Sequence, residues 1–265
     1  MEFIGKHNLK LKEALAIKRS KGRKSALFLL EGFREIHKAL NYGYECVRIF
    51  CSPNVSEKER GLYDLIQNSN IERLWCSDSI LSQLSYKENH DNFIAVMKKK
   101  WWDKDTFLRK KRNELPFYLI IEQVEKPGNV GALLRIADGA GVDGVILCDP
   151  VIDLYNPNLL RSSLGTAFTL PIWQASLEEV FITIAQEKWE VFVTSPGADA
   201  MYFDKNYQKP IALVFGSEKD GLTSSWLDGR FAKIALPMKG EADSLNLSTA
   251  VSAIVYEVVR QRCLS

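Results

Sequence analysis

The chain has 265 residues, of which 46% are hydrophobic and 26% charged, a composition typical of one large or two ordinary globular domains. No apolar run approaches the roughly 20 residues that a membrane span requires, and the charged start MEFIGKHNLKLKEALAIKRS argues against a secretory signal. Five scattered cysteines form no CxxC pair and only three histidines accompany them. We therefore expect reduced thiols, a cytoplasmic protein and no metal site.

The charge differs between the two parts of the chain. Residues 1–112 contain 23 Lys and Arg against 14 Asp and Glu, whereas residues 113–265 contain 12 against 19. Such an asymmetry is typical of a protein in which one part binds a polyanion. The alternative, an ordinary solvated basic surface, is not excluded by the charge count.

The first 98 residues predict a small α/β domain. Eight basic residues and one acid lie between residues 6 and 24, interleaved with apolar residues, so that one side of the segment can pack while the other faces phosphates. The candidate phosphate contacts are Lys18, Arg19, Arg23 and Lys24. Further on, the pattern predicts a strand running into a helix in FLLEGFREIHKAL, a strand in VRIFCSP, a helix over residues 57–68 and a strand in NFIAVMK.

Residues 99–115 are predicted to form a basic linker. Eight basic residues and two acids lie between residues 98 and 112, and the segment closes on a proline. Trp101 and Trp102 in this segment could stack on bases. We favour the alternative that they dock one domain on the other.

Strand and helix patterns alternate from residue 116 to the end. Strands are predicted in FYLIIE, VDGVILC, EVFVTS, IALVFGSE and FAKIALPM, with helices over residues 129–140, 159–164, 177–188 and 244–262. Apolar strands separated by helices indicate a mainly parallel sheet with helices on both faces. The predicted fold class is α/β, with this larger domain over residues 116–265.

Ligands of open α/β sheets bind beyond the carboxyl ends of the strands, and the segment EKPGNVGALLRIADGAGV follows the first strand of this domain. Asn129 stands at the position expected for a helix N-cap. Gly128 and Gly131 allow a close backbone approach to a ligand, and helix N-terminal amides favour anions. Arg135 lies on the other side of the predicted helix from most of its apolar face, so a surface arginine is its simplest interpretation.

Two more strand ends carry polar and glycine residues. LVFGSEKDGL places Gly216, Glu218 and Gly221 directly after a buried strand. LPMKGEADSLNLSTA places a flexible loop before the last helix, which we expect Ser244 and Asn246 to open. Each segment taken alone is also compatible with an ordinary turn or helix start.

Taken in order, the three segments resemble the TrmH/SpoU family of SPOUT methyltransferases, which are RNA ribose 2′-O-methyltransferases. The matching residues are Asn129-x-Gly131-x-x-x-Arg135, then Phe215-Gly216-x-Glu218-x-x-Gly221-Leu222, then Leu236-Pro237-Met238 leading to Ser244-Leu245-Asn246-Leu247-Ser248. Each motif is weak alone, but the ordered set at successive strand ends is specific. It covers about residues 116–262, and residues 1–98 resemble more loosely the family's substrate-binding extension.

The resemblance implies a trefoil knot in the C-terminal domain, which binds S-adenosyl-L-methionine. It also implies a homodimer through this domain, with a site built from both subunits and RNA bound by the basic N-terminal domain. The implied cofactor contacts are Gly216, Leu236, Met238 and Leu245. The implied catalytic cluster is Asn129, Arg135, Glu218, Ser244 and Asn246.

Elementary chemistry limits the role of Arg135 in such a cluster. A guanidinium with a pKa above about 12 is a poor general base, so we prefer Arg135 as a clamp on the phosphate beside the target ribose. Glu218 would then orient Asn129 or Arg135, and the proton acceptor stays open. Large-subunit ribosomal RNA is the favoured substrate and transfer RNA the alternative.

Two other functions compete with methyl transfer. A nicotinamide dehydrogenase would use Gly128, Gly131 and Asp149, but the G-x-G-x-x-G spacing is missing and no catalytic His or Tyr is evident. The second competing function is that of a non-catalytic ribosome-assembly protein on the same scaffold. The intact motif residues argue against it.

Overall fold

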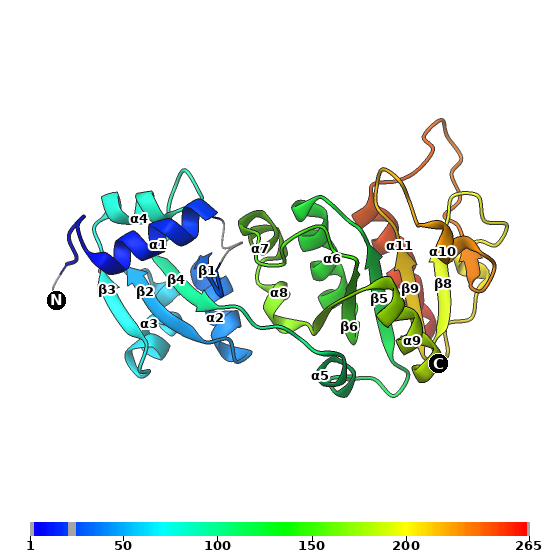
Figure 1. Ribbon diagram of the computed structural model, residues 1–265, viewed down its shortest axis with the longest axis horizontal. Coiled ribbons are helices and arrows are strands. Elements are labelled where there is room, and N and C mark those ends of the chain that lie inside the picture. The colour runs from blue at the N-terminus through cyan, green and yellow to red at the C-terminus, as the bar shows by residue number, and fades with distance from the viewer. Residues whose placement is uncertain (1–2, 21–24, 264–265) are drawn as a thin grey trace. The chain divides into compact units, whose positions relative to one another are not determined.

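The computed structural model describes residues 3–20 and 25–263. The chain divides into two compact units, shown in Figure 1. The first unit comprises Met1–Lys100 with Asp153–Thr169, and the second comprises Trp101–Ile152 with Leu170–Ser265. No helix of the described residues is long and apolar enough to cross a membrane.

The first unit is built on a four-stranded sheet with the order β1-β4-β2-β3. β4 runs antiparallel to both β1 and β2, whereas β2 and β3 are parallel. Its elements are α1 (Leu9–Ser20), β1 (Leu27–Glu31), α2 (Phe33–Asn41), β2 (Cys46–Cys51), the 3₁₀ turn η1 (Glu57–Glu59), α3 (Arg60–Gln67), β3 (Glu72–Trp75), α4 (Asp78–Leu84) and β4 (Phe93–Lys98). The strands and helices expected for this domain are confirmed, whereas α1, β3 and α4 are additional.

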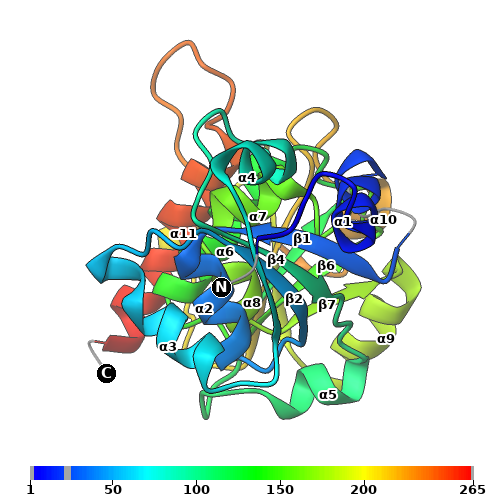
Figure 2. The same ribbon diagram turned by 90° about the vertical axis from the view of Figure 1, so that its left-hand side faces the viewer.

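Helices cover both faces of this sheet. Figures 1 and 2 show α1 and α4 on one side and α2 and α3 on the other. The apolar side chains of α1 and α4, including Leu11 and Leu81, form one cluster with Phe50 and Ile94 of the sheet. The basic residues of α1 therefore have a rigid, packed support.

Residues 153–169 pack within the first unit although they lie far along the chain. They contain α7 (Pro157–Ser163) and α8 (Thr166–Thr169). The ring of Tyr155 lies 4.4 Å from that of Phe28, and Asp153 forms a 3.1 Å ion pair with Lys99. The sequence pattern predicts the helix near residues 159–164 but not this grouping, because the contacts that produce it are distant in sequence.

The second unit contains a six-stranded sheet with the order β10-β8-β9-β5-β6-β7. All neighbouring strands are parallel. Its elements are α5 (Lys104–Arg109), β5 (Phe117–Glu122), α6 (Pro127–Gly139), β6 (Gly144–Cys148), β7 (Ile172–Ala175), α9 (Leu177–Glu187), β8 (Glu190–Thr194), the 3₁₀ turn η2 (Tyr202–Asp204), β9 (Ile211–Phe215), α10 (Ser224–Leu227), β10 (Ala232–Ile234) and α11 (Leu247–Cys263). The predicted α/β class with a parallel sheet is confirmed.

Helices also cover both faces of the larger sheet. α6 and α11 pack against each other on one face. α5, α9 and α10 contribute Phe107, Val180 and Trp226 to the core on the opposite face. All six residues of β5, in the middle of the sheet, are buried because helices cover both faces.

The predicted linker is folded onto the second unit over part of its length. Phe107 of α5 is fully buried, and its ring lies so close to Gly144 that an added Cβ there would be 2.4 Å from it. Trp102 forms an isolated parallel bridge with Trp173 at the β7 edge. The side chain of Trp101, by contrast, is 58% exposed.

Candidate functional site

The strand order of the second unit creates a switch point between β5 and β9. From β5 the chain continues through β6 and β7 on one side, whereas β9, β8 and β10 lie on the other. A cavity of about 690 Å³ lies at the carboxyl ends of β8, β9 and β10. Its lining comes from residues 194–196, residues 215–222 and parts of 234–254, together with Lys126 and Leu227. This is the edge at which ligands of open parallel sheets collect.

The loop after β9 folds back tightly on itself. Ser217 and Gly221 exchange two backbone hydrogen bonds of 3.1 Å, and Gly221 adopts a left-handed φ of 68°. An added Cβ at Gly216 would lie 2.2 Å from the carbonyl of Gly221 and 2.5 Å from the Leu222 nitrogen. Glycine is therefore required at 216 by the backbone of its own loop, whatever ligand the cavity holds.

The tip of this loop is tied to α6. Glu218 accepts a hydrogen bond from the side-chain amide of Asn129. The expectation that Asn129 is the N-cap of this helix is wrong, because α6 begins at Pro127 and its N-cap is Lys126. Proline suits the first helical position, where its fixed φ fits and its missing N–H costs nothing. Asn129 thus lies in the first helical turn, with its side chain available to Glu218.

A second carboxylate, which the sequence reasoning missed, holds the returning end of the same loop. Glu122 is the last residue of β5 and is fully buried. It accepts hydrogen bonds from the Thr223 nitrogen and hydroxyl, both at 2.8 Å, and from the Trp226 indole N–H at 3.0 Å. A charged residue closing an otherwise apolar strand, FYLIIE, is the only signal that could have drawn attention to it.

The loop between β10 and α11 forms another wall of the cavity. Ser244, Leu245 and Asn246 are exposed on it. Asn246 caps α11, since its side-chain oxygen accepts from the Ser248 nitrogen at 3.0 Å and from the Ser248 hydroxyl at 2.7 Å. The expectation that Ser244 opens this helix is wrong, because the helix begins at Leu247 and Ser244 stays in the loop.

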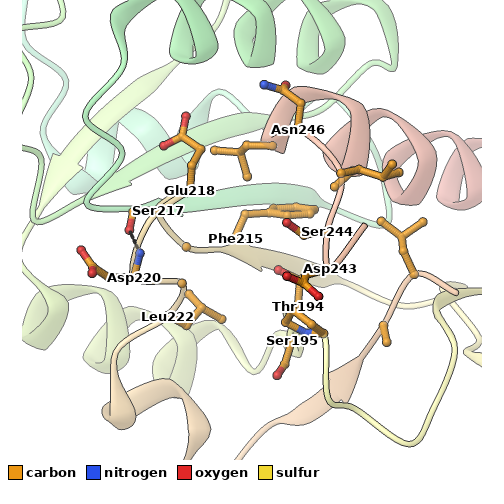
Figure 3. A pocket seen from close by; sticks show the side chains of 18 of the residues that line it. Thr194, Ser195, Phe215, Ser217, Glu218, Asp220, Leu222, Asp243, Ser244 and Asn246 are labelled. Atoms are coloured by element: carbon orange, nitrogen blue, oxygen red, sulfur yellow. Dashed lines mark hydrogen bonds between the residues drawn. The ribbon is translucent and has the colours of Figure 1, made fainter. Parts of the chain in front are cut away.

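The cavity brings most of the predicted site residues together. Those that line it are Gly216, Glu218, Leu236, Met238, Ser244, Leu245 and Asn246. Figure 3 shows Glu218 and Asn246 on one side of the cavity and Thr194 and Ser195 on the opposite side. Asn129 joins this group through its hydrogen bond to Glu218.

Arg135 is not part of the cavity lining. It is exposed on α6, six residues after Asn129, which corresponds to about 9 Å along the helix axis and about 240° around it. Within one chain the two side chains therefore leave the helix in different directions. Arg135 is thus separated from the cavity residues within one chain.

The cavity combines apolar walls with charged groups of both signs. Leu222, Ile234 and Ile254 supply apolar surface. The charged residues of the lining are Glu218, Asp220 and Asp243 with Lys126 and Lys219. Its volume lies within the roughly 300–1,000 Å³ of small-molecule sites. These features suit a small molecule that has both apolar and charged parts.

The predicted phosphate contacts on the first unit differ in their availability. Lys18 donates to the Gln83 carbonyl at 2.7 Å, and its ammonium lies 5.7 Å from the centre of the Tyr86 ring, so it also holds α1 in place. Arg19 is exposed at the end of α1. Arg23 and Lys24 lie outside the described residues.

The two parts of the chain match two family models. Residues 116–256 match the SpoU rRNA Methylase family. Residues 8–95 match the MRM3-like substrate binding domain. The first match covers the cavity and all three motif segments, and the second covers most of the first unit.

Curated and solved relatives extend over nearly the whole chain. A protein of Streptomyces viridochromogenes named 23S rRNA (uridine(2479)-2′-O)-methyltransferase is 30% identical over 94% of this chain and 88% of its own. A crystal structure of an RNA 2′-O ribose methyltransferase is 31% identical, with a TM-score of 0.82 over 99% of this chain and 100% of its own. The SpoU methyltransferase AviRb from Streptomyces viridochromogenes, solved with AdoMet, is 26% identical, with a TM-score of 0.85 over 97% of this chain and 99% of its own.

Proposed function

The chain belongs to the SpoU rRNA methylase family, and from this premise we propose that it transfers the methyl group of S-adenosyl-L-methionine to a ribose 2′-hydroxyl of RNA. The observation that carries the proposal is the cavity at the carboxyl ends of β8, β9 and β10. The two motif loops that follow β9 and β10 line it, and Asn129 of the first motif is joined to Glu218 at its rim.

The cavity residues fit the cofactor. Gly216 permits the tight loop, while Leu236, Met238 and Leu245 offer apolar side chains and backbone groups on a second wall. When bound, the sulfonium supplies an activated methyl group and leaves as a neutral thioether. A preorganised site from which water is excluded favours that loss of charge.

The polar residues at the rim have positioning roles toward the ribose. Because the amide nitrogen of Asn129 donates to Glu218, the amide oxygen of Asn129 is left to accept a hydrogen bond from the substrate. Ser244 and Asn246 stand on the neighbouring exposed loop. We assign them the alignment of the hydroxyl that receives the methyl group.

Arg135 completes the site only in a homodimer through the second unit. Its exposed position outside the cavity of its own chain is the reason for this assignment. There it clamps the phosphate next to the target ribose, since a guanidinium forms a bidentate pair with phosphate oxygens.

The favoured substrate is large-subunit ribosomal RNA. A relative at 30% identity is named for 23S rRNA, and residues 8–95 match a substrate binding domain. The basic balance of residues 1–112 provides the electrostatic attraction to RNA. Transfer RNA is the competing substrate that the experiment must include.

The proposal is tested by methyl transfer in vitro. Purified protein, radiolabelled adenosylmethionine and either ribosomal or transfer RNA are incubated, and the RNA is digested to nucleosides. We expect labelled 2′-O-methylnucleosides from large-subunit ribosomal RNA. Label found only on bases, or no label in either RNA, would overturn the proposal.

A further inference from the structure

The loop after β9 is held by two contacts, one with the end of β5 and one with the first turn of α6. At the tip of the loop, Glu218 accepts from Asn129. At its returning end, the backbone nitrogen and the hydroxyl of Thr223 donate hydrogen bonds to Glu122. Between these two ties lie Gly221, in its left-handed conformation, and Leu222, a wall of the cavity.

The hydrogen bonds to Glu122 are more deeply buried than the one to Glu218. Glu122 is 0% exposed, and the third donor, the indole of Trp226, is likewise 0% exposed. The Trp226 ring packs edge-on against Phe181 at 4.7 Å. Water therefore cannot replace a lost partner, and a buried donor without an acceptor is costly.

From this geometry we infer that Glu122 is a positioning residue for the cofactor cavity, which holds the loop after β9 in its binding conformation through Thr223 and Trp226. Glu122 does not line the cavity itself and acts through Leu222, which directly precedes Thr223. The inference rests on the proposed function, because it concerns how the same cavity is kept ready for adenosylmethionine.

A second buried carboxylate offers a matched control. Asp143 is also 0% exposed, and it accepts from the Asn113 nitrogen and side-chain amide at 2.9 Å and from the Phe117 nitrogen at 2.8 Å. Phe117 begins β5, whereas Glu122 ends it. The two carboxylates are thus equally buried and multiply bonded, but Asp143 lies at the end of β5 remote from the cavity.

The experiment compares Glu122→Gln and Asp143→Asn in the full chain. Calorimetric titration measures adenosylmethionine affinity, and hydrogen exchange measures the protection of the Thr223 and Phe117 amides. We expect Glu122→Gln to raise the Kd about tenfold or more, the equivalent of one hydrogen bond to a charged group, and to release the Thr223 amide. Asp143→Asn should release the Phe117 amide and leave the Kd within about twofold of the wild-type value.

Thr223 variants keep the test decisive if Glu122→Gln does not fold. Thr223→Val removes the hydroxyl donor and should raise the Kd severalfold, whereas Thr223→Ser keeps both donors and should restore wild-type affinity. An unchanged Kd in Glu122→Gln or Thr223→Val, or equal weakening by Asp143→Asn, would overturn the positioning role. Failure of the wild-type protein to bind adenosylmethionine would instead overturn the proposed function.

Discussion

Replacing Gly216 by alanine perturbs the cavity with a single methyl group. The new Cβ would lie 2.2 Å from the Gly221 carbonyl, whereas carbon contacts are favourable at about 3.5–4.0 Å, so the loop must move by roughly 1 Å or more. That movement breaks the two hydrogen bonds between Ser217 and Gly221, at about 0.5–1.5 kcal/mol each. Overpacking adds about 1–3 kcal/mol.

Together these terms disfavour the closed loop by about 2–6 kcal/mol. Because the loop follows the end of β9, it can open without unfolding the sheet. We therefore expect adenosylmethionine affinity to fall at least tenfold, about 1.4 kcal/mol. The free energy of unfolding should fall by less than the full penalty on the closed loop, because the sheet stays folded when the loop opens. Calorimetric titration and urea denaturation measure the two effects.

Gly197→Ala is the matched control for this substitution. An added Cβ at Gly197 meets no atom within 4 Å, and the residue is exposed in the loop after β8. Its affinity should match the wild type, with a stability change within about 0.5 kcal/mol. If Gly216→Ala behaved like Gly197→Ala in both measurements, the close backbone contact would not shape the cavity.

Substitutions at three residues and one labelling reaction test other parts of the structure. Phe107→Ala should lower the free energy of unfolding in urea by about 3–5 kcal/mol, because the ring is fully buried; a loss below about 1 kcal/mol would mean that α5 is not part of the core. Arg135→Ala should abolish turnover but preserve cofactor affinity, and Arg135→Lys should recover little, since a point charge cannot replace a bidentate fork; wild-type turnover in the lysine variant would show that charge suffices. Arg19→Ala should reduce the salt dependence of RNA filter binding by roughly 0.7–0.9 in log–log slope; an unchanged slope would remove Arg19 from the RNA contact. Iodoacetamide at pH 8 should label exposed Cys263 well before Cys51, because burial raises the pKa of the Cys51 thiol to about 12 and keeps it protonated; equal labelling, measured by mass spectrometry, would contradict the buried position.

Hydrophobic periodicity predicts the elements whose pattern is long enough to be distinctive. β5, β9 and α9 are examples, each with at least five residues and clear apolar content. β3 and β7 have four residues each, which is too short for an alternation to stand out. The linker helix α5 is hidden by its basic composition, because a single phenylalanine provides its anchor in the core.

The start of α6 shows two local rules in competition. Asparagine is a strong N-cap residue, whereas proline is favoured one position inside the helix. The segment KPGN contains both, and the structure begins the helix at Pro127. The bond from Asn129 to Glu218 joins residues 89 positions apart, so sequence spacing could not decide between the rules.

The motif residues of the cavity could be predicted from the sequence, but the contacts that hold them in place could not. Gly216, Glu218 and Asn246 follow from the ordered motifs, and all three line the cavity. Glu122 reaches Thr223 across 101 positions, a contact that no local pattern encodes. The trefoil knot, the homodimer, the division into domains at residues 98 and 116 and the catalytic role of Arg135 stay predictions.

A map of ribose methylation in cells shows directly whether this chain methylates a ribose of RNA. Ribose methylation is mapped at nucleotide resolution across all ribosomal and transfer RNA, in cells with the gene, without it, and with a Glu218→Ala copy. We expect that a 2′-O-methyl group in large-subunit ribosomal RNA disappears without the gene and is not restored by the Glu218→Ala copy. Identical methylation maps in all three strains would contradict it.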